Sequence, residues 1–227
     1  MQPSTQPLSQ RTLADLAVAD STATRVFHQH GLDFCCGGRV SLADACKEAG
    51  LDVAQVSSEL EAAAALSTHE TSWAEAPLND LVQHLLDRFH ADHREELPRL
   101  IAMAEKVESV HAEKPDCPKG LAKHLAMMME SLEDHMQKEE QILFPAIEAG
   151  RGPEAAMPVR VMESEHRDHG LNLERLAALA HGYEPPADAC NTWTALYLGL
   201  KQLQEDLMQH IHLENNVLFP RALTGER

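Results

Sequence analysis

The chain has 227 residues, of which 44% are hydrophobic but only 4% aromatic, and it carries 36 acidic against 19 basic side chains. A formal charge of −17 with neutral histidines disfavours binding to nucleic acid or to anionic membrane surfaces. Leu, Ala and Met supply most apolar positions and alternating Val/Ile/Thr runs are nearly absent, so an all-α fold is predicted.

Targeting signals are not evident in the sequence. No apolar run approaches the roughly 20 residues that span a bilayer, and residues 1–7 lack a basic region followed by an apolar stretch. Five cysteines is an odd number without the spacing of a disulfide framework, which is typical of a reducing compartment. A cytoplasmic protein without a membrane segment is therefore expected.

Residues 1–66 predict a small domain of short helices. Thr12 and Ser41 each precede Leu-Ala-Asp, a helix-capping pattern, and a further helix is expected over residues 52–66. Between the two capped helices, the sequence Asp-Phe-Cys-Cys-Gly-Gly at 33–38 predicts a turn, because glycine adopts backbone angles closed to other residues.

The two cysteines of this turn are candidate functional thiols. Neighbouring cysteines do not easily close a disulfide with each other, so Cys35 and Cys36 are expected to be free, with at least one accessible. His28 and His30 could lower a thiol pKa or join a transient metal site. The alternative is that both cysteines are small buried hydrophobic residues.

Residues 67–76 are polar and aperiodic and predict a linker, and residues 77–227 predict four long helices. These helices are expected over 78–111, 119–148, 154–181 and from Pro185 to near the C-terminus, with Pro98 kinking or breaking the first. Short connections between long amphipathic helices favour an antiparallel four-helix bundle.

The most informative pattern is a motif that occurs twice, H-x-x-x-E-x-x-x-L-F-P, at 135–145 and 210–220. Residues i and i+4 share one face of a helix, so each copy directs one imidazole and one carboxylate the same way. His90 precedes His135 by 45 positions and His166 precedes His210 by 44. The second half of the bundle thus repeats the first around a pseudo-two-fold axis.

Four imidazoles and two carboxylates would then meet. Such donors suit iron, manganese or zinc, but six are more than one zinc ion needs. Two iron or manganese ions bridged by Glu139 and Glu214 would use the whole set and leave open positions for a small molecule. The alternative is scattered surface histidines among the 14 of the chain; the repetition of the motif argues against it.

These motifs resemble those of a known family. Residues 77–227 resemble a hemerythrin-like domain, and the chain from about residue 8, including 33–38, resembles the di-iron iron–sulfur cluster repair proteins (the repair of iron centres family). Further family-like stretches are 90–98, 106–111, 162–166 and 213–220. The resemblance implies the same six metal ligands that the repeat predicts: His90, His135, Glu139, His166, His210 and Glu214.

The resemblance also implies a function. It implies two non-haem iron ions bridged by carboxylates and the repair of iron–sulfur clusters damaged by nitric oxide or other oxidants, with the damaged iron–sulfur proteins as partners; a homodimer is left open. The thiol turn would contact the client or hand over iron and thiol equivalents. The alternatives are a di-iron nitric oxide or peroxide reductase and an oxygen-binding or sensing hemerythrin.

Neighbouring residues offer competing assignments. His93 could replace His90 as the ligand on the first helix, although the family motif favours His90. His169 could add a fifth histidine ligand, but it is expected to be a solvated residue on a helix face. Oxygen-carrying hemerythrins place their additional histidine at the next position, where this chain has Gly170. His212 is expected to point away from the cluster.

Two glutamates are expected near the metal ligands. Glu133 and Glu165 are predicted to face inward, where each would hydrogen-bond a ligand imidazole or handle protons near the irons. The alternative for each is a solvated surface glutamate.

Overall fold

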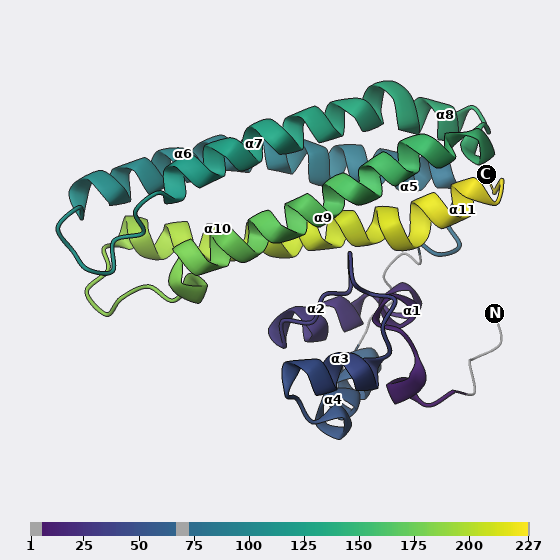
Figure 1. The fold of residues 1–227 in the computed structure, drawn as a ribbon, viewed down its shortest axis with the longest axis horizontal. Helices are drawn as coiled ribbons and strands as arrows, with labels where there is room; N and C mark the ends of the chain where they lie inside the picture. The colour runs from purple at the N-terminus through teal and green to yellow at the C-terminus, as the bar shows by residue number, and fades with distance from the viewer. Residues whose placement is uncertain (1–5, 67–72, 227) are drawn as a thin grey trace.

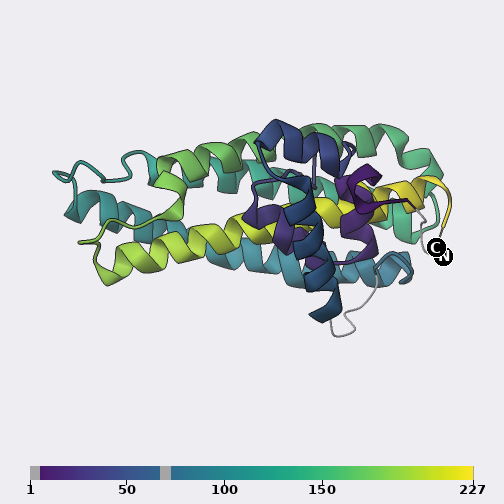
Figure 2. The same ribbon diagram turned by 90° about the horizontal axis from the view of Figure 1, so that it is seen from below.

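The computed structural model describes residues 6–66 and 73–226. Within them the chain is helical, apart from an isolated antiparallel backbone bridge between Thr12 and Ser41. Figure 1 shows a long helical bundle with a small helical domain on one side of it. Figure 2 shows that this small domain lies across the middle of the bundle rather than beyond its end.

The small domain contains α1 (Leu13–Ala19), α2 (Thr22–Gln29), α3 (Leu42–Ala49) and α4 (Val53–Leu66). Both predicted caps are confirmed, because the side chains of Thr12 and Ser41 accept hydrogen bonds from the backbone N–H of Asp15 and Asp44. The backbone N–H groups of Leu13 and Ala14 donate to the carbonyls of Val40 and Gly38. The loop that carries the two cysteines is therefore fastened to the start of α1.

The bundle has four long helical segments, and three of them contain a π-helical stretch. The first runs through α5 (Leu78–His84), η2 (Leu85–His90) and α6 (Ala91–Val110). The second runs through α7 (Leu121–Lys138), η3 (Glu139–Leu143) and α8 (Phe144–Glu148), and the third is α9 (Ala156–Leu179). The fourth runs through α10 (Asn191–Leu213), η6 (Glu214–Leu218) and α11 (Phe219–Leu223). The π-helical segments are η2, η3 and η6.

The expected break at Pro98 and the expected helix start at Pro185 were wrong. Pro98 does not break its helix, since α6 continues to Val110; Pro98 is exposed, while Leu97 and Leu100 hold this part of the helix in the core. The fourth helix begins at Asn191 rather than at Pro185. Its prolines form a turn instead, in which the N–H of Ala189 donates to the carbonyl of Pro186.

Two apolar clusters divide the interior. One joins the small domain, including Phe27, to the half of the bundle that contains Leu100 and Trp193. The other gathers the opposite end of the bundle around Phe144 and Phe219. Leucine is the most frequent residue in both clusters. The buried polar residues of the next section belong to neither cluster.

The predicted linker 67–76 lies partly outside the described residues, which resume at Trp73, and the predicted domain boundaries at residues 66 and 77 stay predictions. None of the helices in the described part of the chain combines the length and the hydropathy that crossing a membrane requires.

Candidate metal centre

Buried polar side chains are concentrated in the middle of the bundle. All six residues predicted from the repeated motif are among them, each with at most 1% of its surface exposed. The buried polar or charged residues of the described ranges are His90, His93, His124, His135, Glu139, His166, His169, His210, His212 and Glu214. Burying so many groups is costly unless they bind something.

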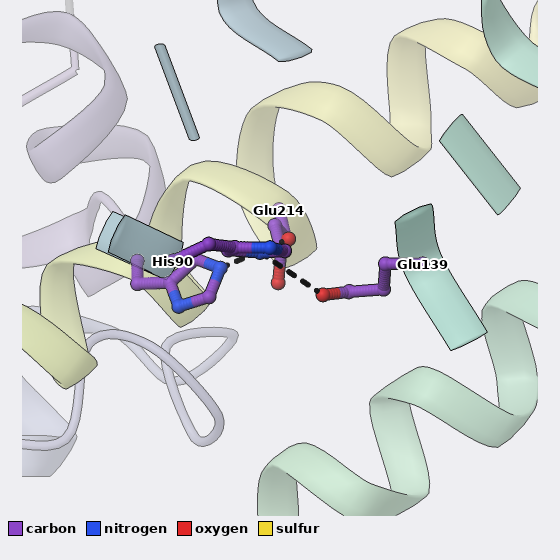
Figure 3. A group of neighbouring side chains, drawn as sticks. His90, Glu139 and Glu214 are labelled. Atoms are coloured by element: carbon purple, nitrogen blue, oxygen red, sulfur yellow. Dashed lines mark hydrogen bonds and ion pairs between the residues drawn. The ribbon is translucent and has the colours of Figure 1, made fainter. Parts of the chain in front are cut away.

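The two carboxylates lie between two pairs of imidazoles. Oε2 of Glu139 lies 3.4 Å from Nε2 of His90, and its Oε1 lies 3.4 Å from Nε2 of His135. Oε2 of Glu214 lies 3.1 Å from Nε2 of His166, and its Oε1 lies 3.2 Å from Nε2 of His210. Figure 3 shows His90, Glu139 and Glu214 turned toward one another.

The donor atoms therefore form two groups of four that share both carboxylates. One group is His90, Glu139, His210 and Glu214, and the other is His135, Glu139, His166 and Glu214. Within each group the donor atoms all lie within 4.8 Å of one another. In each group two imidazole nitrogens and two carboxylate oxygens can hold one divalent cation, and each carboxylate can bridge the two cations.

The electrostatics of the cluster favour a bound cation. Burial, followed by the charge of Glu214, raises the pKa of the Glu139 carboxyl to about 8. Burial also opposes ionisation of Glu214, but His210 and His166 hold its pKa well below the usual range. Both oxygens of Glu139, Oε2 of Glu214 and Nε2 of His90 have no hydrogen-bond partner in the described structure. A cation would satisfy all four atoms.

Three of the four imidazoles are also held from outside through Nδ1. Nδ1 of His90 lies 2.7 Å from Oε1 of Glu140, and Nδ1 of His166 lies 2.8 Å from Oδ1 of Asn215. In both halves of the bundle, the residue after the shared glutamate thus holds the lone histidine of the preceding helix. A hydrogen bond at Nδ1 fixes the tautomer that presents a free Nε2 to a metal.

The second pair of imidazoles breaks this symmetry. Nδ1 of His135 lies 2.9 Å from Oε2 of Glu165, the residue before His166. The equivalent residue before His90 is Phe89, whose ring stacks on His210 with centroids 5.4 Å apart. Nδ1 of His210 has no hydrogen-bond partner among the described residues. His210 is therefore the least firmly oriented of the four rings.

The shared Leu-Phe-Pro tail has a packing role. Phe144 lies against the ring of His90 with centroids 5.7 Å apart, and Phe219 stacks on His166 at 5.9 Å. Each aromatic residue thus covers the lone histidine of its own half of the repeat, and both belong to the apolar cluster at one end of the bundle. The tails help to exclude water from this side of the cluster.

The two predicted outer glutamates occupy different positions. Glu165 bonds His135 as expected and also accepts from Lys138 at 2.6 Å; these partners hold its pKa below the ordinary value, although burial opposes them. Glu133 instead pairs with Arg94 at 2.8 Å and with Gln137, and its side chain is 37% exposed. Arg94 separates it from Glu140, so the expected contact with a ligand imidazole is made by Glu140 rather than by Glu133.

The neighbouring histidines lie outside both groups of four donors. His93 is buried, and its ring lies 5.4 Å from the ring of His210. The prediction that His169 is solvated was wrong: it is 2% exposed and its ring lies 5.0 Å from that of His135. Burial lowers the pKa of His169 to about 3, so its ring stays neutral. His212 packs on Phe34 and bonds Asn216, away from the cluster as expected.

Asp33 shapes the cysteine loop. Its Oδ1 accepts from the backbone N–H of Cys35 and Cys36, and its Oδ2 accepts from that of Gly37 at 2.8 Å. Cys35 is buried and Cys36 is half-buried. The hydrogen bond to Cys36, followed by burial, raises the pKa of the Cys35 thiol well above its usual value.

The two histidines near the loop in sequence serve other contacts. His28 pairs with Glu205 at 3.3 Å and His30 with Glu59 at 2.5 Å. The expectation that they lower a thiol pKa therefore gains no support from their contacts. Of the two neighbouring thiols, that of Cys36 is the more accessible.

The cysteine loop rests directly on the helices that carry the cluster. The Cys36 thiol donates to the carbonyl of His166, with 3.4 Å between the atoms. Nδ2 of Asn215 donates to the carbonyl of Cys35 at 3.0 Å, and Nδ2 of Asn216 donates to that of Phe34 at 3.1 Å. A side chain at Gly170 would start 3.9 Å from the sulfur of Cys36, so the thiol stands over the position where an oxygen-carrying hemerythrin has its additional histidine.

Comparisons with known proteins agree with this architecture. Residues 81–222 match the hemerythrin HHE cation binding domain, and residues 9–64 match a domain of unknown function, DUF542. The chain is 51% identical to the iron–sulfur cluster repair protein YtfE of Musicola paradisiaca over 96% of its own length and 98% of the relative. The YtfE proteins of Pectobacterium carotovorum and Yersinia pseudotuberculosis are 50% and 49% identical, each alignment covering 95% of this chain and 98% of the relative.

The chain belongs to the YtfE family of iron–sulfur cluster repair proteins. The family resemblance and the all-α hemerythrin-like fold expected from the sequence are confirmed. The DUF542 match contains the whole cysteine loop, and the HHE match contains all six residues of the cluster.

The sequence analysis did not predict two residues that contact the imidazoles of the cluster, Glu140 and Asn215. Both follow a shared glutamate at the start of a π-helical segment. In a regular α-helix, consecutive residues point in clearly different directions. A π-helical stretch changes that register and is frequent at functional sites. The available signal was a polar residue directly after each Glu of the repeated motif.

Proposed function

We propose that this chain repairs iron–sulfur clusters damaged by nitrosative or oxidative stress, and that its buried cluster holds two iron ions bridged by Glu139 and Glu214. One observation carries the proposal: the two oxygens of each glutamate face imidazoles of different donor groups. Relatives covering nearly the whole chain are named for cluster repair, which supports repair over the reductase alternative. A cytoplasmic location and a homodimer stay predictions from the sequence.

The donors fit iron. Imidazole and carboxylate suit borderline divalent ions, and two four-donor positions leave each ion with open coordination sites. When bound, such a pair supplies either iron for transfer to a client or a centre that binds and reduces a small oxidant. The chain's own residues prepare the site: Glu140, Asn215 and Glu165 hold three imidazoles in one tautomer, and Phe144 and Phe219 shield it from water.

The cysteine loop supports repair over oxygen carriage. The Cys36 thiol lies against the carbonyl of His166 and over Gly170, one side of a pocket of about 190 Å³ whose other walls include Arg39, Arg167 and Asn215. A thiol beside the metal-bearing helix can meet a client or a small oxidant at the same face. An oxygen carrier has no need for such a thiol.

The test of function is a repair assay with a separated-function variant. Purified protein loaded with iron should restore activity to a nitric oxide-damaged iron–sulfur enzyme under anaerobic conditions. Replacing Cys35 and Cys36 together with serine should keep the iron content of the wild type while reducing the repair rate about tenfold or more. Cys190→Ser, an exposed cysteine, is the control. Loss of iron from the double variant would show that the thiols and the bundle do not divide the work in this way.

Metal binding is expected to release a proton. Because the raised pKa of Glu139, about 8, exceeds neutral pH, the metal-free carboxyl is protonated at pH 7, and a cation must displace that proton to be bridged. Affinity should therefore rise with pH until about pH 8 and then level off. Calorimetric titration of the metal-free protein in two buffers of different ionisation enthalpy measures the proton count. Binding with no proton release at pH 7 would contradict the assignment.

A further inference from the structure

A polar groove runs between α6 and α10, one helical turn from the cluster. Its volume is about 320 Å³, and its walls carry four carboxylates against a single guanidinium. The charged residues that line it are Arg88, Asp92, Glu95, Glu96 and Asp206. Arg88 lies across it, pairing with Asp92 on one helix and with Asp206 on the other at 2.7 Å. Arg99 pairs with one of these carboxylates, that of Glu96, so four carboxylates face two guanidinium groups, and the remaining negative charge suits a cation.

A buried imidazole connects this groove to the cluster. His93 lines the groove, is only 1% exposed, and its Nε2 has no hydrogen-bond partner among the described residues. Leaving such a nitrogen buried and unpaired costs stability, and a bound cation would remove that cost. Its ring centre lies 5.4 Å from that of His210, a member of the first donor group.

The imidazole nearest this groove, that of His210, has the fewest hydrogen bonds to residues around the cluster. His210 is the imidazole whose Nδ1 lacks a partner, whereas His135 and His166 are held by Glu165 and Asn215. A ring without an outer hydrogen bond can turn more easily, and outer partners typically contribute about 10- to 100-fold to metal affinity. The cation beside His90 and His210 is therefore the one that can exchange most readily.

We propose that this groove is the path by which ferrous ion reaches and leaves the cluster, with His93 as a transient ligand between the outer carboxylates and His210. The proposal rests on the proposed function, because iron transfer to a client requires such a path. Only ligand exchange is involved: the ion trades carboxylate oxygens at the groove for the imidazole of His93 and then for that of His210. Arg88 must swing away from Asp92 and Asp206 for the ion to pass.

A transit residue and a resident ligand predict different kinetics. Removing a resident ligand speeds release and weakens binding, whereas removing a transit residue slows loading and release by a similar factor and leaves the binding constant unchanged. The experiment measures anaerobic loading of the metal-free protein with ferrous ion, and release from the loaded protein to an excess of a ferrous chelator, both by stopped-flow absorbance. Iron stoichiometry and the Mössbauer spectrum are recorded beside them.

His93→Leu should slow both rates on the order of tenfold at unchanged stoichiometry. Glu95→Gln, at an exposed position where folding is not at risk, should slow loading by roughly threefold and weaken its dependence on salt. Arg88→Gln should speed both rates. The matched controls are His169→Leu, a buried imidazole of the other half that does not line the groove, and Glu105→Gln, an exposed residue farther along α6.

The outcomes separate this path from the proposed function. A wild-type protein that binds no iron contradicts both. Two bound ions with rates unaffected by Glu95→Gln and Arg88→Gln contradict the path alone. Faster release with a weaker binding constant in His93→Leu would make His93 a resident ligand and also overturn the path, as would equal slowing by the control substitutions.

Discussion

Replacing Glu139 with leucine is expected to reduce iron loading from two ions per chain to one or none. Its two oxygens each lie 3.4 Å from an imidazole nitrogen of a different group, those of His90 and His135. The substitution therefore removes one donor from both metal positions at once. The loss of iron affinity should exceed the roughly 10- to 100-fold that an outer hydrogen-bonding partner contributes. Iron content after anaerobic reconstitution, with Mössbauer spectra for nuclearity, measures it.

The same variant should be more stable than the wild type when both lack metal. Glu139 is fully buried and both its oxygens lack a hydrogen-bond partner in the described structure, so leucine should raise the free energy of unfolding by about 1–3 kcal/mol. With iron bound, the free energy of unfolding of the wild type should exceed that of the variant. Glu130→Leu, exposed on the same helix, is the control and should retain both ions. Two ions in Glu139→Leu would refute the bridge.

The six candidate ligands could be predicted because they follow helical periodicity within the motif and a matched spacing between its copies. An i, i+4 pair fixes a shared face without any knowledge of the neighbouring helices. The structure brings these six side chains together as the pattern predicted. The all-α bundle followed from composition and from the length of the amphipathic segments.

The contacts around the cluster could not be predicted in the same way. Glu133 was predicted to face inward and contact a ligand imidazole, yet Glu140, which follows Glu139 in η3, makes that contact. His169 was expected in solvent, yet it is buried. The sequence alone does not specify which face of its helix is covered by α7. Packing between helices, and not local pattern, decides such burial.

The position of the cysteine loop is a long-range property. Cys36 contacts His166, which is 130 residues away in the sequence, and no local signal specifies that contact. Only the structure shows that Gly170 lies beside this thiol, where an added Cβ would stand 3.9 Å from the sulfur of Cys36.

Asn215 is expected to couple the cysteine loop to the metal. Its Oδ1 accepts from Nδ1 of His166 at 2.8 Å while its Nδ2 donates to the carbonyl of Cys35 at 3.0 Å. Asn215→Leu removes both bonds and should weaken iron binding by about 10- to 100-fold, while speeding alkylation of Cys36. Chelator competition measures the first effect, and iodoacetamide labelling followed by peptide mass spectrometry measures the second.

Two further variants test the contact with the metal cluster and the contact with the cysteine loop separately. Asn215→Asp keeps an acceptor for His166 but loses the donor to Cys35, so iron affinity should fall much less than in Asn215→Leu while Cys36 becomes more reactive. Asn216→Leu, which loses the bond to Phe34 but touches none of the four cluster imidazoles, should behave likewise. An iron affinity as low as that of Asn215→Leu, in either variant, would contradict the division of roles.

The coupling must also be reciprocal. If bound iron orients the ring of His166, it holds Asn215 in place and thereby the loop, so iron should slow Cys36 alkylation in the wild type. Two coupled equilibria affect each other by the same factor. The factor by which bound iron raises the docking equilibrium of the loop must therefore equal the factor by which docking of the loop raises the affinity for iron. Asn215→Asp breaks the link to Cys35 and should abolish the iron dependence of alkylation. Were that dependence to survive in Asn215→Asp, the thiol contact with the carbonyl of His166 would be the coupling element instead.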